Sequence, residues 1–131
     1  MYFHVWFVSK CRRPVIEGIV CSVLKKAFTE CIRRHSFNVP AIGMGRDHVH
    51  MLINADNKCE LVGIVRVLKT ISAREALMLL RFEGLNNGHF WARRYGFREL
   101  SDHELSFIVS YINDHKFSNF TGSIKSPLVP P

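Results

Sequence analysis

Asp47-His48-Val49-His50-Met51-Leu52 carries two histidines two residues apart, within an alternation that continues to Ile53 and is typical of a β-strand. His48 and His50 must then lie on one face of that strand, while Val49 and Met51 point to the other and are expected to pack against helices. Two neighbouring imidazoles can bind a metal ion or a phosphate, although two histidines on a sheet face can also be only solvated.

The residues on both sides of this strand have regular hydrophobic periodicities. Aromatic and β-branched residues predict a first strand over 2–8, with His4 of uncertain direction. Apolar positions repeating every three or four residues predict helices over 16–35 and 61–80. A strand over 37–45 is expected to be irregular or at an edge because it contains Pro40 and two glycines.

The C-terminal half of the chain contains two local signals. Asn86-Asn87-Gly88 predicts a turn that leads into a strand over 89–97. Ser101 and Glu104 predict a capping box that opens a third helix. Tyr111 and His115 are four residues apart on that helix, so their side chains are expected to lie one above the other.

This order of elements predicts an α+β, ferredoxin-like fold. We expect a split βαβ antiparallel sheet with helices on one face, an extra C-terminal helix carrying the tyrosine, and an open second face. Residues 1–117 are expected to form a single domain, and 118–131 a flexible tail that ends in prolines.

Composition points to a folded, basic domain. The 131 residues include 18 Lys and Arg against 11 Asp and Glu, for a net charge of +7. This excess favours a nucleic-acid partner, with a basic surface that only aids solubility as the alternative. The apolar runs are too short for a membrane span, no signal peptide is evident, and none of the four cysteines is in a Cys-x-x-Cys motif. A cytoplasmic protein with reduced cysteines is therefore expected.

Several of these segments together resemble one family, the single-tyrosine HUH transposases of insertion-sequence 200/605 type (transposase A-like). The resemblance extends over residues 2–116. The matching segments are Val5-Trp6-Phe7-Val8-Ser9-Lys10 with Arg12-Arg13-Pro14, Asp47-His48-Val49-His50, Leu68-Lys69-Thr70-Ile71-Ser72-Ala73-Arg74, Phe90-Trp91 and Tyr111-Ile112. The resemblance implies a metal-dependent transposase that nicks and transfers single-stranded DNA and recognises DNA hairpins at element ends.

The resemblance also implies roles for individual residues. His48 and His50 match the two metal-binding histidines, His115 matches a third ligand position, and Tyr111 matches the nucleophile that forms a 5′-phosphotyrosine. The implied cofactor is a divalent metal, Mg²⁺ or Mn²⁺, with no nucleotide cofactor. The implied assembly is a homodimer in which Tyr111 and His115 act in cis or in trans. Lys69 matches a lysine of the second helix.

Basic residues in several elements are candidates for binding DNA, although a solvated face explains each of them equally well. They are Lys10, Arg12, Arg13, Lys69, Arg74, Arg93 and Arg94. Two alternatives to the transposase remain, a non-catalytic binder of single strands or hairpins and a nuclease that processes chromosomal repeats.

Some site residues also have plain structural interpretations. Tyr111 alone could be a packing residue, and His115 a surface residue at a helix end. Asp47 is expected to cap a turn rather than to orient a histidine. Phe90 and Trp91 are expected to be core residues rather than base-stacking platforms.

Overall fold

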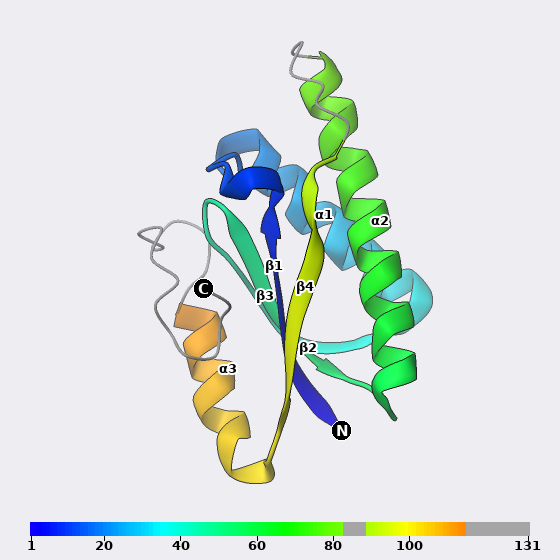
Figure 1. Cartoon of the computed structure of the whole chain (residues 1–131), viewed down its shortest axis with the longest axis vertical. Helices are drawn as coiled ribbons and strands as arrows, with labels where there is room; N and C mark the ends of the chain where they lie inside the picture. The colour runs from blue at the N-terminus through cyan, green and yellow to red at the C-terminus, as the bar shows by residue number, and fades with distance from the viewer. Residues whose placement is uncertain (83–88, 115–131) are drawn as a thin grey trace.

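A computed structural model describes residues 1–82 and 89–114 and shows a four-stranded antiparallel sheet with helices on both faces (Figure 1). The strand order is β2-β3-β1-β4. The elements in chain order are β1 (Tyr2–Ser9), the 3₁₀ turn η1 (Lys10–Arg12), α1 (Gly18–His35), β2 (Asn38–Met44), β3 (His48–Asn54), α2 (Lys58–Phe82), β4 (Trp91–Leu100), η2 (Asp102–Glu104) and α3 (Leu105–Asp114). The predicted α+β, ferredoxin-like fold is confirmed.

The main core lies between the sheet and the pair α1 and α2. Alternate residues of the two central strands point into it, Phe3, Val5 and Phe7 from β1 and Val49, Met51 and Ile53 from β3. All six side chains are at most 1% exposed. The alternation predicted for the β3 stretch is therefore confirmed, and the histidines lie on the face away from α1 and α2.

The expectation that this second face is open is wrong. Helix α3 lies across it, and Ile108 and Ile112 pack against Ala41 of β2 and Leu52 of β3 in a second, smaller core (Figure 1). The physical reason is the apolar stripe of α3, which must be buried, and Leu52 offers apolar surface on the histidine face.

The ends of the elements agree with the local signals. β2 is an edge strand whose register shifts between Asn38 and Ala41, around Pro40, as its sequence predicts. Ser101 and Glu104 form the predicted capping box. Arg98 of β4 donates a further hydrogen bond to Glu104 and lowers the pKa of that carboxyl to about 2. The predicted turn at 86–88 and the tail at 118–131 lie outside the described residues.

No helix among the described residues is long and apolar enough to cross a membrane.

Gly96 of β4 leaves room for the indole of Trp6, its partner on β1. A Cβ at Gly96 would lie 2.2 Å from Trp6 Nε1. Gly96→Ala is therefore expected to lower the free energy of unfolding by about 1–3 kcal/mol, because the indole must shift within a packed layer. Urea unfolding followed by circular dichroism measures the change.

Gly63→Ala is the matched control, because Gly63 lies in α2 with no atom near its would-be Cβ. That change is expected to raise the free energy of unfolding by about 0.4–1 kcal/mol through helix propensity and a less flexible unfolded chain. Equal effects of the two substitutions would contradict the close packing of Trp6 on Gly96.

Candidate active site

The two histidines of β3 lie side by side on the face that α3 covers. Their ring centroids are 5.4 Å apart. His48 is 1% exposed and His50 is fully buried. Burial of two imidazoles costs free energy unless their nitrogens have partners, so they are not a merely solvated pair.

Asp47 fixes the orientation of His48. Its Oδ1 lies 3.1 Å from His48 Nδ1, and because a carboxylate only accepts hydrogen bonds, Nδ1 carries the proton. Nε2 is then the unprotonated nitrogen of a neutral His48, the tautomer that carboxylates produce in metal-binding histidines. Asp47 Oδ2 also accepts a hydrogen bond from Arg12 Nε at 3.3 Å. The expectation that Asp47 serves mainly the turn is therefore wrong.

His4 of β1 is a third histidine at this place, and its direction was uncertain from the sequence. It is fully buried, with Nε2 3.5 Å from His50 Nδ1. Burial, and secondarily the charge of Arg98, lowers the pKa of His4 to about 4, so its ring is neutral at pH 7. Its Nδ1 has no hydrogen-bond partner within residues 1–82 and 89–114. The alternation of β1 with Phe3 and Val5 is the signal that could have placed His4 on the histidine face.

Helix α3 brings Tyr111 onto the histidines. The Tyr111 ring is nearly perpendicular to those of His50 and His4, with centroids 5.3 and 6.2 Å away. Gly43 of β2 permits this approach, since a Cβ there would lie 2.5 Å from the carbonyl oxygen of Ile112 and 2.8 Å from His50 Nε2. The helix residue and the strand residues, about 60 positions apart in sequence, thus meet at one place.

The donor set fits part of a metal site. His48 and His50 supply imidazole nitrogens, which suit Mn²⁺ or Zn²⁺ and can share Mg²⁺ with oxygen ligands. His115, the third expected ligand, lies outside the described residues. Among those that are described, no three His, Cys, Asp or Glu side chains gather closely enough to hold an ion.

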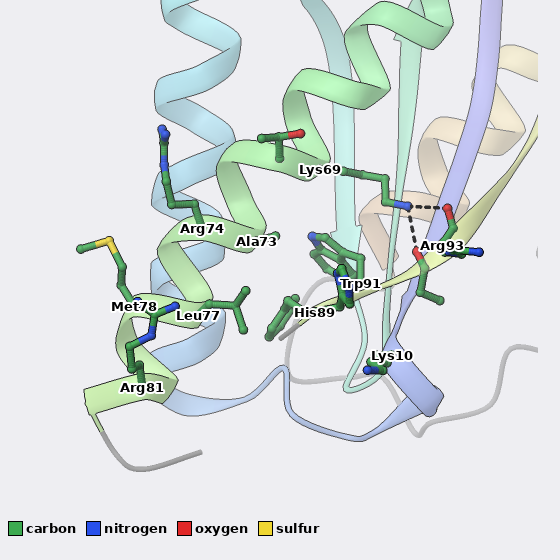
Figure 2. A pocket seen from close by; sticks show the side chains of 13 residues that line it. Lys10, Lys69, Ala73, Arg74, Leu77, Met78, Arg81, His89, Trp91 and Arg93 are labelled. Carbon is green, nitrogen blue, oxygen red and sulfur yellow. Dashed lines mark hydrogen bonds between the residues drawn. The ribbon is translucent and has the colours of Figure 1, made fainter. Parts of the chain in front are cut away.

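The predicted DNA-binding residues lie in different parts of the molecule. Four of the seven line a pocket of about 780 Å³ between α2 and β4 (Figure 2). These are Lys10, Lys69, Arg74 and Arg93. Arg12 is paired with Asp47 beside His48, while Arg13 and Arg94 are exposed elsewhere.

Lys69 has a structural contact as well. Its Nζ donates hydrogen bonds to the carbonyl oxygens of Ala92 and Arg93, at 2.9 and 3.2 Å, and so ties α2 to β4 (Figure 2). Burial lowers its pKa. Next to it, Trp91 is 5% exposed and donates from Nε1 to Ser72 Oγ at 2.9 Å. Phe90 is 4% exposed, and the prediction that both aromatics are core residues is confirmed.

Comparison with known proteins gives matches that extend over most of the chain. A family model described as "Transposase IS200 like" matches residues 1–115. The chain is 28% identical over 112 residues to the ISDra2 transposase TnpA of Deinococcus radiodurans, which covers 84% of this chain and 80% of that protein.

Two solved structures share the fold. A candidate transposase from Deinococcus radiodurans R1 superposes with a TM-score of 0.67 and 22% identity, over 90% of this chain and 92% of the other. A REP-associated tyrosine transposase bound to a REP hairpin gives a TM-score of 0.63 and 15% identity, over 86% of this chain and 64% of the other.

Proposed function

Because the chain belongs to the IS200-like transposase family of DNA-processing enzymes, we propose that it cleaves and rejoins single-stranded DNA at insertion-sequence ends. The observation that carries this proposal is the contact between Tyr111 of α3 and His50 of β3, whose ring lies beside that of His48. The reaction takes place in the cytoplasm and needs no external nucleotide.

Tyr111 is the proposed nucleophile. Its Oη forms a bond to phosphorus, the bond from phosphorus to the 3′ oxygen breaks, and the phenol proton is lost while the 3′ oxygen gains one. The products are a free 3′-hydroxyl and a 5′-phosphotyrosine. Because phenolate is a fair leaving group, a 3′-hydroxyl can reverse the step and rejoin the strand without an energy source.

His48 and His50 are the proposed ligands of a divalent metal, Mg²⁺ or Mn²⁺, with His115 as a third. Such an ion supplies Lewis acidity that neutralises charge growing on the phosphate. Asp47 holds His48 in the tautomer with Nε2 unprotonated, and a neutral His4 that accepts a hydrogen bond from His50 Nδ1 does the same for His50. In both histidines, Nε2 is then the nitrogen that would bind the metal ion.

Hairpin recognition and assembly belong to the same proposal. The fold is shared with a transposase solved on a REP hairpin, which supports a hairpin as the DNA partner here. The basic residues of the sequence supply phosphate contacts. We further propose a homodimer, with Tyr111 and His115 completing the site in cis or in trans.

Covalent trapping tests the proposal. Hairpin oligonucleotides with single-stranded flanks, copied from the DNA beside the coding region, are incubated with the protein and Mn²⁺ and run on denaturing gels. We expect a protein–DNA adduct with these strands, none with the same sequence as a full duplex, and none in EDTA.

Hairpin binding without an adduct in either Mg²⁺ or Mn²⁺ would overturn the strand-transfer proposal in favour of a non-catalytic hairpin binder. An equal yield from duplex DNA would contradict the assignment to single strands.

A further inference from the structure

A second place on the molecule has the chemistry of a nucleotide site. It is the groove between the C-terminal half of α2 and the first residues of β4, on the face of the sheet opposite Tyr111 (Figures 1 and 2). We call it the α2/β4 groove and define it by Lys10, Arg74, Arg81, Arg93, Met78 and Trp91. Its volume, about 780 Å³, is ample for a nucleotide.

Positive charge dominates this groove. Arg74 and Arg81 lie seven residues apart, two turns along one face of α2, with Lys10 and Arg93 on the facing side (Figure 2). Among the residues that the structure describes, no Asp or Glu lines the groove. None of the ion pairs found within residues 1–82 and 89–114 involves these four cations. The groove therefore attracts an anion, and phosphates match both its sign and its spread of charge.

The space between the cations is apolar. Leu77 and Met78 of α2, and Phe90 and Trp91 at the start of β4, contribute to its lining. Met78 is 57% exposed, although it lies among basic residues. An apolar surface rimmed by cations suits a base with its phosphate. In a duplex the bases are stacked inside and only phosphates would reach the groove, so an unpaired nucleotide fits it better.

A short path joins this groove to the candidate active site. Lys10 lines the groove, and Arg12, two residues on in η1, pairs with the Asp47 that holds His48. Cys11 and Arg12 have positive φ, 58° and 52°, which costs free energy in residues other than glycine. This strained turn follows the central strand β1, and it places Lys10 at the groove and Arg12 at Asp47, where one DNA strand could contact both.

We propose that the α2/β4 groove binds an unpaired nucleotide of the DNA strand, with the base against Leu77 and Met78 and the phosphates on Arg74 and Arg81. The strand then passes over the Lys10–Arg12 turn toward Tyr111. This inference rests on the proposed function, and it adds a place where single-stranded DNA is held away from the reacting phosphate.

Binding of a twelve-residue oligothymidine tests the inference without any cleavage. Fluorescence anisotropy is measured in Mg²⁺ over a range of salt concentrations, with Tyr111→Phe as the parent protein. Arg74→Gln/Arg81→Gln is expected to raise Kd about tenfold and to lower the slope of log Kd against log salt by roughly one, because phosphate contacts are lost. Met78→Gln is expected to raise Kd about threefold with the slope unchanged, because it removes apolar contact and no charge.

Lys58→Gln/Arg33→Gln is the matched control. It removes two exposed charges at the first residue of α2 and the last turn of α1, outside the groove. Its Kd is expected to stay within twofold of the parent. An equal loss in this control would overturn the inference, since any two positive charges would then suffice.

Photo-crosslinking locates the base. Oligothymidine carrying 5-iododeoxyuridine is expected to crosslink to the groove residues of α2 between 74 and 81 or to those at 89–93. Crosslinks confined to the α3 face would overturn the proposed place. Binding of an oligoglutamate that depends on Arg74 and Arg81, with DNA affinity independent of them, would also overturn it and assign the groove to an acidic protein. None of these outcomes depends on adduct formation, which tests the proposed function separately.

Discussion

Replacing Tyr111 with phenylalanine is expected to abolish the covalent protein–DNA adduct while leaving the fold and DNA binding intact. The substitution removes only the phenolic oxygen, and the ring that lies against His50 and His4 remains. Without a nucleophile no phosphotyrosine can form, so adduct yield should fall at least about a thousandfold, as with other nucleophile deletions. Denaturing gels with labelled hairpin DNA measure the yield, and anisotropy measures binding.

The other two tyrosines supply the control. Tyr2 lies partly buried beside the small core under α3, and Tyr95 is on β4 near Lys69. Tyr2→Phe and Tyr95→Phe are each expected to keep near-parental adduct yield. An adduct that persists in Tyr111→Phe and disappears in one of these variants would move the nucleophile to that residue.

The β3 stretch could be predicted because its signal is local. A period of two over His48 to Ile53 places the histidines on one face whatever the rest of the chain does. The capping box at Ser101 and Glu104 and the irregular edge strand around Pro40 are local in the same way. Such features depend on backbone geometry and neighbours within four residues, which the sequence contains.

The covered histidine face could not be predicted in this way. Whether α3 turns back over β3 depends on long-range packing, on room at Gly43, and on the tie between Arg98 and Glu104. For the same reason the direction of His4 stayed uncertain from the sequence, since its role comes from a side-chain contact with His50 on the neighbouring strand β3. Asp47 was assigned to a turn because a single position cannot reveal that its carboxylate faces His48.

The net charge of the chain favoured a nucleic-acid partner, but it did not show which basic residues would contact phosphates. Lys10, Arg74 and Arg93 were equally compatible with phosphate contact and with a solvated surface. The fold brings these three together around one groove and adds Arg81, which no motif singled out. Arg12 is placed instead beside the histidines. The fold therefore gathers basic residues that are spread along the sequence at two separate places, the α2/β4 groove and the surroundings of the β3 histidines.

Removal of either β3 histidine is expected to abolish binding of the divalent ion. His48→Ala and His50→Ala each delete one of the two proposed imidazole donors, so Mn²⁺ affinity, measured by electron paramagnetic resonance of free Mn²⁺, should fall at least about a hundredfold, and adduct yield should fall with it. His35→Ala, at the last position of α1, is the control and is expected to bind Mn²⁺ as the parent does. Parental Mn²⁺ affinity in both alanine variants would contradict the metal assignment.

Variants of the residues that orient these histidines provide a second test of the proposed metal site. Asp47→Asn and His4→Phe leave both donors in place and are expected to weaken Mn²⁺ binding by about 10–100-fold, because the imidazoles lose the partners that set their tautomers. His4→Phe also removes a buried Nδ1 that lacks a partner among the described residues, and such a group costs about 1–3 kcal/mol. It also takes the His4 partner from the buried His50 Nδ1, so the two effects offset each other and the free energy of unfolding should stay close to that of the parent while metal affinity falls. A merely structural His4 would show the opposite pattern, with stability lost and metal affinity kept, so the two measurements together decide why a histidine is buried at this position.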